Sequence, residues 1–143
     1  MELDFALLAD GVSHRPDGKL DVYGAGFDTI LGSAVPVQHP RLTVALRVLI
    51  SRQEAEQHHE LDVILRAVDG NELARAHAEV APIPRAAEAI PADRLAGIGM
   101  VLGFDHVVFP AYGAYEFVIR WDSDDVRHPI RLFVAELPPP ATP

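Results

Sequence analysis

Apolar and polar residues alternate with a period of two along residues 41–51, and this alternation constrains the fold more than any other feature. The apolar set is Leu42, Val44, Leu46, Val48 and Ile50. Successive side chains of a β-strand point to opposite faces, whereas a helix would spread these five residues around its axis. The segment is therefore predicted to be a strand with one buried face.

The same alternation recurs along most of the chain. It is found in residues 2–7, 20–22, 61–68, 98–104, 115–122 and 130–135, and more weakly in residues 73–80. Turn residues separate these runs, as in Arg15-Pro16-Asp17-Gly18 and Asp69-Gly70-Asn71. Residues 52–59 and the alanine-rich middle of residues 82–94 are the two candidate short helices. The pattern predicts an all-β chain, specifically a two-sheet antiparallel β-sandwich of about eight or nine strands.

Length and composition set the broad class. The 143 residues fit one domain, predicted over residues 1–137, with a proline-rich disordered tail over residues 138–143. A net charge of −9 disfavours nucleic acid and anionic membranes as partners, and the longest apolar run is far shorter than a membrane span of about 20 residues. The acidic start Met1-Glu2-Leu3-Asp4 does not match a signal peptide, so a cytoplasmic location is expected.

Three segments near the N-terminus carry a family resemblance. The chain begins with Met1-Glu2-Leu3-Asp4-Phe5-Ala6-Leu7-Leu8-Ala9-Asp10 and continues with Gly18-Lys19-Leu20 and Gly24-Ala25-Gly26-Phe27-Asp28. These segments resemble a family of small bacterial proteins of unknown function with the pattern M-x-L-x-F-A-L-L-A-D, then G-K-L, then G-x-G-[FW]-D. The resemblance implies a β-rich cytoplasmic domain and supplies no catalytic residue.

The most suggestive chemical cluster is a candidate metal site formed by His58, Glu60 and His77. His58 and Glu60 share one face of a predicted strand, and the Asp69-Gly70-Asn71 hairpin brings His77 onto the neighbouring strand. Imidazole and carboxylate groups bind zinc or iron. The alternative interpretation is a solvated strand edge, since the spacing matches no established metal motif.

Other candidate sites have simpler structural interpretations. The Asp122–Asp125 loop is rich in oxygen ligands, but aspartate and serine also favour hairpin turns. Gly24-Ala25-Gly26 lacks the following helix that a phosphate site needs. Of Tyr112, Tyr115 and Trp121, only Tyr112 lies in a predicted loop and is expected to be exposed, where it would anchor a sugar or another small ligand.

A second face of the predicted strands also carries apolar residues. The candidate interface residues are Leu49, Ile64, Val68, Val118 and Phe133. A monomeric sandwich normally leaves this side polar, so the pattern favours a homo-oligomer or a protein partner.

Three functions follow from these observations, and the sequence leaves them open. The first is a non-catalytic binding or assembly module that self-associates. The second is a metal-binding or metal-dependent protein using His58, Glu60 and His77. The third is small-ligand or carbohydrate binding. Without a recognisable catalytic constellation, the sequence predicts no catalytic residue and no cofactor and favours binding over enzymatic activity.

Overall fold

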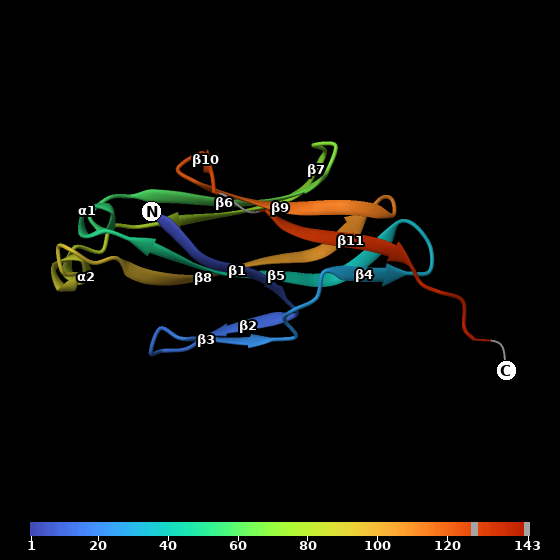
Figure 1. Ribbon diagram of the computed structural model, residues 1–143, viewed down its shortest axis with the longest axis horizontal. Helices are drawn as coiled ribbons and strands as arrows, with labels where there is room; N and C mark the ends of the chain where they lie inside the picture. The colour runs from blue at the N-terminus through green and yellow to red at the C-terminus, as the bar shows by residue number, and fades with distance from the viewer. Residues whose placement is uncertain (127–128, 142–143) are drawn as a thin grey trace.

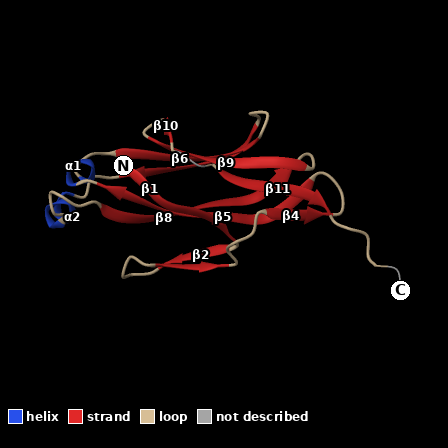
Figure 2. Cartoon of the chain, viewed as in Figure 1, coloured by secondary structure: helices blue, strands red, loops and turns tan. Residues whose placement is uncertain are grey.

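The computed structural model describes residues 1–126 and 129–141, and it is built mainly of strands (Figures 1 and 2). The strands of the described residues are β1 (Glu2–Ala9), β2 (Gly11–His14), β3 (Leu20–Tyr23), β4 (Thr29–Gly32), β5 (Val37–Ile50), β6 (His59–Ala67), β7 (Glu72–Val80), β8 (Ala96–Phe109), β9 (Gly113–Trp121), β10 (Asp124–Asp125) and β11 (Ile130–Glu136). Two short helices, α1 (Arg52–Ala55) and α2 (Pro84–Ala89), lie at one end of the molecule. The prediction of a β-rich chain is confirmed.

The strands are divided among three sheets. One sheet has the order β1-β5-β8, a second has the order β4-β11-β9-β6-β7 with β10 paired to β9, and β2 and β3 form a two-stranded hairpin. All pairs are antiparallel except β4 with β11, which is parallel. The hairpin and the parallel pair both go beyond the two-sheet antiparallel arrangement that the sequence predicts.

The hydrophobic core lies between the two larger sheets, which form the main layers in Figure 1. Aromatic pairs connect the layers: Phe104 of β8 meets Phe117 of β9 with ring centroids 5.3 Å apart, and Phe109 meets Tyr115 at 4.9 Å. The alternating apolar set of β5 is at most 1% exposed. Each such side chain contributes about 1.5–3 kcal/mol through burial, so the period of two in the sequence is the source of this layering.

The β2–β3 hairpin lies on the outer side of the three-stranded sheet (Figure 1). At this point β8 presents glycines to the hairpin. Leu20 packs so closely against Gly99 that a Cβ atom added at position 99 would lie 3.3 Å from the Leu20 side chain. The guanidinium group of Arg47 lies across Gly97 and forms an ion pair with Asp4. The glycines of β8 therefore allow the hairpin and long side chains to approach the sheet closely.

The first strand does not pair with the next strand along the chain. The Arg15–Gly18 turn closes β2 onto β3, whereas β1 pairs with β5, with Leu8 opposite Val44. Asp10 separates β1 from β2, and its N–H donates to the carbonyl of Tyr23 over 3.0 Å. This break redirects the chain from the three-stranded sheet into the hairpin.

The two helices agree with the predicted segments. Helix α1 begins after Ser51, and α2 ends at Ala89, ahead of Ile90 and Pro91, because a residue before proline disfavours helical backbone. No helix within the described residues is long and apolar enough to cross a membrane. Residues 138–141 have no regular secondary structure, and Thr142 and Pro143 lie outside the described residues, so disorder of the tail stays a prediction.

Candidate ligand pocket and the neighbouring histidine cluster

A buried histidine stands at the junction of α1, β6 and β9. His59 is the first residue of β6 and is 4% exposed. Its ring stacks on Trp121 of β9 with centroids 4.8 Å apart and an interplanar angle of 29°. The period of two brings both side chains to the inner face, since Leu61 pairs with Trp121 and His59 lies two residues before Leu61.

Both ring nitrogens of His59 face hydrogen-bond acceptors. Nδ1 lies 2.7 Å from Oδ2 of Asp122, and Nε2 lies 2.6 Å from the main-chain carbonyl of Glu54. A carboxylate and a carbonyl both accept hydrogen bonds, so the doubly protonated imidazolium is the form of the ring that satisfies both contacts. Its positive charge is balanced by Asp122 and lies against the face of Trp121, which attracts cations.

The pKa values of His59 and Asp122 are shifted in the directions that favour the charged form of each group. Burial opposes the charge on His59, but the hydrogen bonds to Asp122 and Glu54 outweigh burial and raise the pKa of His59 above 6.5. Burial similarly acts on Asp122, yet the bonds from His59 and from the N–H of Glu60 lower its pKa. The protein therefore holds the charged forms of both groups.

Local backbone structure positions the two partners of His59. Asp122 and Ser123 have φ values of 49° and 71°, a left-handed conformation that aspartate tolerates better than most residues. This turn places Oδ1 of Asp122 2.9 Å from the N–H of Glu60. On the other side, a capping box fixes α1: Oε2 of Glu54 accepts from the N–H of Ser51 over 2.7 Å, and the Ser51 hydroxyl accepts from the N–H of Glu54.

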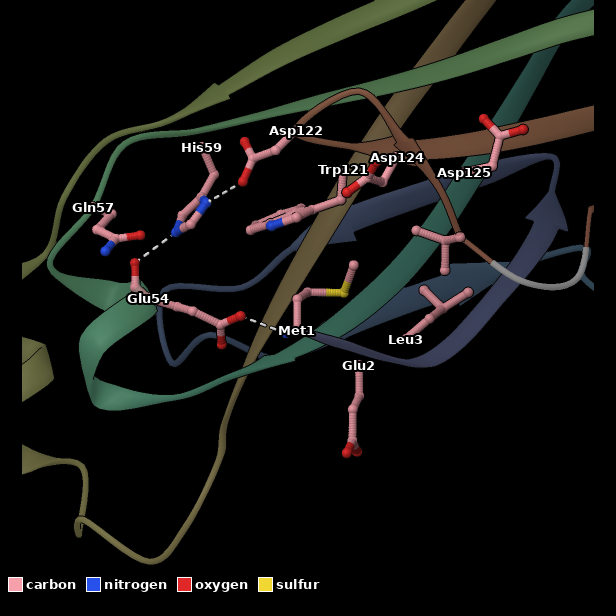
Figure 3. Close-up of a pocket in the computed structure, with 11 residues that line it drawn as sticks. Met1, Glu2, Leu3, Glu54, Gln57, His59, Trp121, Asp122, Asp124 and Asp125 are labelled. Atoms are coloured by element: carbon pink, nitrogen blue, oxygen red, sulfur yellow. Dashed lines mark hydrogen bonds and ion pairs between the residues drawn. The ribbon is translucent and has the colours of Figure 1, made fainter.

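A pocket of about 720 Å³ opens beside this pair (Figure 3). Its lining residues are Met1, Glu2, Leu3, Glu54, Gln57, His59, Trp121, Asp122, Asp124, Asp125 and Val126. The lining combines an apolar wall with five carboxylates, and the amino group of Met1 forms an ion pair with Glu54. Burial acts against the charge of Glu54, but hydrogen bonds from that amino group and from Ser51 lower the pKa of Glu54.

The carboxylates of the pocket differ in their partners. Glu54 and Asp122 are engaged as described above, and Asp125 accepts from Arg120 over 2.6 Å. Asp124 pairs with Trp121 through the backbone, but its carboxylate has no hydrogen-bond partner within residues 1–126 and 129–141, and Figure 3 shows it beside Trp121. Glu2 points away from Met1 and Trp121 in the same view. Asp124 is thus the carboxylate best placed to meet a ligand.

The predicted metal ligands lie on the outer face of β6 and β7. Ligand atoms of Glu60, His77 and Glu79 all lie within 4.8 Å of one another. His58 is close to this group, with its Nε2 atom 3.9 Å from Oε2 of Glu79. The structure therefore brings Glu60 and His77 together, adds Glu79, and places His58 at the margin; metal binding itself stays a prediction.

The predicted interface residues are dispersed. Ile64 and Val118 are paired on the outer face of the larger sheet but are 3% and 4% exposed, flanked by rows that contain Arg66 and Arg120. Long charged side chains cover apolar neighbours with their aliphatic stems.

Two other members of the predicted interface remain exposed on the same sheet. Val68 is 63% exposed and Phe133 is 44% exposed. Leu49 is half-buried on β5, in the three-stranded sheet. A partner on this face would therefore meet Val68 and Phe133 and would find Ile64 and Val118 already covered.

Sequence reasoning missed His59, Asp122 as its partner, and Glu79. The signal for His59 was its parity with Leu61 and Val63, which predicts an inward direction and separates it from His58. The signal for Glu79 was its position two residues after His77 on the same strand face. The partnership with Asp122 spans 63 residues and had no local signal.

Fold and site together define a mostly β domain with one acidic pocket at the helical end and a histidine–carboxylate cluster on the opposite face of β6. The chain belongs to the family described as "Family of unknown function (DUF6941)", whose model matches residues 4–135. No curated protein matches the chain.

Proposed function

We propose that this chain is a non-catalytic binding module whose pocket takes a small organic cation, an ammonium group attached to a hydrocarbon chain. The two larger sheets serve as a β-sandwich scaffold for the pocket. The observation that carries the proposal is the lining itself, in which the carboxylates among the described residues outnumber the cationic groups beside an apolar wall. Pockets that combine apolar walls with a few convergent polar groups and perturbed pKa values are the usual sites of ligand binding.

The electrostatics of the pocket favour a cation over an anion. His59 and the amino group of Met1 are each already paired with a carboxylate. Asp124 has no such partner within the described residues, and the whole chain carries a net charge of −9. An anionic ligand would meet repulsion from both sources, whereas an ammonium group would gain a charge-assisted hydrogen bond.

The apolar wall specifies the rest of the ligand. Trp121, Leu3 and Val126 line the pocket together with the side chain of Met1. Transfer of a methylene group from water to such a surface contributes about 0.8 kcal/mol. An alkylammonium ion therefore matches both halves of the pocket, and an inorganic cation matches only one.

Binding fits this geometry better than catalysis. A histidine that acts as a general base needs a free ring nitrogen within reach of the substrate, and both nitrogens of His59 are engaged with Asp122 and Glu54. The described lining residues include no serine, threonine, cysteine or lysine that would act as a nucleophile. His59 is thus a structural cation that fixes the pocket wall.

The chain contains one tryptophan, so the fluorescence of Trp121 reports directly on the pocket. Titration with n-hexylammonium should give a saturable change, and sodium hexanoate at equal ionic strength should give none. Asp124→Asn should weaken n-hexylammonium binding about fivefold, the effect of a partly exposed charge contact of roughly 1 kcal/mol. Asp69→Asn, which removes a carboxylate from the distant β6–β7 turn, is the matched control and should bind normally.

Two outcomes would refute this function. One is a fluorescence change that hexanoate produces as readily as n-hexylammonium. The other is an unchanged affinity of Asp124→Asn in protein whose thermal unfolding matches the parent. Either result would remove the charge complementarity on which the choice of ligand rests.

We also propose self-association as a second role, supported by a different surface. Val68, just after the end of β6, forms one outward row with Ala114 of β9 and Phe133 of β11, since the N–H of Val68 donates to the carbonyl of Ala114 and Ala114 pairs with Phe133. Leu31 of β4, 52% exposed, lies in the next outward row, paired with Ala135. Light scattering should detect a dimer that Phe133→Glu dissociates, and a strict monomer at high concentration would exclude this role.

A further inference from the structure

The strongest unassigned feature is the cluster on the outer face of the β6–β7 hairpin, away from the pocket. Register pairs Glu60 directly with Glu79 and Asp62 directly with His77. Neighbouring positions on one face of two strands lie within side-chain contact, so the hairpin holds four ionisable groups in two adjacent rows. Three of them, Glu60, His77 and Glu79, have ligand atoms within 4.8 Å of one another.

His77 is oriented by its neighbour in a way typical of metal ligands. Nδ1 of His77 lies 2.8 Å from Oδ1 of Asp62. A carboxylate that accepts from one imidazole nitrogen fixes the ring and its tautomer and leaves the other nitrogen to bind a metal. Asp62 therefore acts as a positioning residue for Nε2 of His77.

The opposed glutamates supply a second indication. Like charges directly opposite each other on paired strands are destabilising, and Glu60 faces Glu79 across the hairpin. His77 offsets part of the repulsion between the two glutamates. His58 is the other nearby imidazole, and its Nε2 atom lies 3.9 Å from Oε2 of Glu79. A cation held between the two carboxylates would relieve their repulsion.

We propose that Glu60, His77 and Glu79 bind a Zn²⁺ ion, with His58 as the fourth ligand and Asp62 as the positioning partner of His77. Zinc accepts mixed nitrogen and oxygen ligands, usually four of them, whereas Mg²⁺ and Ca²⁺ prefer oxygen alone. All three ligands of the central cluster are exposed, so the ion has access from solvent. This site lies on the outer face of β6 and is independent of the organic-cation pocket.

Calorimetric titration of the metal-free full chain with ZnCl₂ at neutral pH tests the proposal. We expect one zinc per chain. His77→Ala and Glu79→Gln should each weaken binding at least tenfold, and Asp62→Asn should weaken it by about tenfold, the usual effect of losing an outer-shell partner. His58→Ala should have a smaller effect, because His58 lies at the margin of the cluster.

Matched controls separate the site from general charge effects. Glu72→Gln removes a carboxylate from the other end of β7, and His39→Ala removes a histidine from β5. Both should bind zinc as the parent does. Thermal unfolding should confirm that every variant is folded.

Three results would overturn the zinc site: no binding in the micromolar range, normal binding by folded His77→Ala and Glu79→Gln, or Mg²⁺ binding as tight as Zn²⁺. The Trp121 titration with n-hexylammonium is unaffected by His77→Ala if the two sites are independent. Failure of one proposal is therefore distinguishable from failure of the other.

Discussion

Two histidine–aspartate pairs lie on opposite faces of strand β6 and have almost the same contact distance. Nδ1 of His59 lies 2.7 Å from Oδ2 of Asp122, and Nδ1 of His77 lies 2.8 Å from Oδ1 of Asp62. Their environments differ: the side chain of His59 is 5% exposed, whereas that of His77 is 44% exposed. Each pair raises the pKa of its histidine, but only His59 has both nitrogens engaged.

Both histidines pair with an aspartate through Nδ1, so the difference between them lies in Nε2. Whether Nε2 is engaged or open determines whether the histidine has a structural role or can bind a ligand. His59 links helix α1 to the turn after β9 and has no remaining contact to offer a ligand. Asp62 orients His77 but leaves one nitrogen open on the surface. The first pair should therefore govern stability, and the second should matter little for folding.

The largest effect is expected for His59→Ala. The substitution removes two hydrogen bonds and the stacking contact with Trp121, and it leaves Asp122 without its cation. We expect a loss of about 3 kcal/mol in the free energy of unfolding, measured by urea denaturation at pH 6. A loss below 1 kcal/mol would mean that the buried pair contributes no more than a surface ion pair.

A smaller effect is expected from pH, because neutral His59 keeps one of its two hydrogen bonds. Since folding raises the pKa of His59 above its ordinary 6.5, the contribution is complete below pH 6.5 and is lost as pH rises through the folded value. Urea denaturation between pH 6 and pH 9 should show this loss in the parent. His59→Ala should show a flatter profile, and equal slopes in the two proteins would contradict the assignment.

Ser51→Ala should destabilise the protein by about 1 kcal/mol, the usual effect of removing an N-cap side chain. The hydroxyl of Ser51 accepts from the N–H of Glu54, and the carbonyl of Glu54 is the second acceptor of His59. The substitution should therefore also lower the pKa of His59, which NMR titration of its ring protons measures. An unchanged pKa would show that α1 holds the carbonyl without its cap.

Local patterns in the sequence predicted the strands that carry these sites. The period of two placed Leu61 and Val63 inward, and the Asp69-Gly70-Asn71 turn brought His77 to the neighbouring strand, as observed. These features depend on side-chain direction and turn chemistry, which short segments determine. The Arg15–Gly18 turn, which separates the first two alternating runs, closes β2 onto β3 instead of pairing these runs, because the break at Asp10 sends β1 to β5.

The pocket was beyond prediction because its parts are distant in the sequence. Met1, Glu54 and Asp122 converge only after β1, α1 and the turn following β9 have assembled. The residue types of the Asp122–Asp125 segment favour a hairpin turn, with a Ca²⁺ site as the alternative. In the structure, the turn places Asp122 against His59. A single sequence gives the direction of such side chains but not their long-range partners.

The smallest effect sharpens the comparison on the outer face. Glu79→Gln removes the like-charge repulsion with Glu60 and should raise the stability of the metal-free protein by about 0.3 kcal/mol. Glu72→Gln, which removes the ion pair between Glu72 and Arg75, should instead lower it slightly. Urea denaturation of both variants in the presence of a chelator measures the difference. If Glu79→Gln is stabilising and also loses zinc, the outer cluster costs stability for the sake of binding, as functional sites commonly do. If it destabilises as Glu72→Gln does, Glu79 belongs to an ordinary charged strand face.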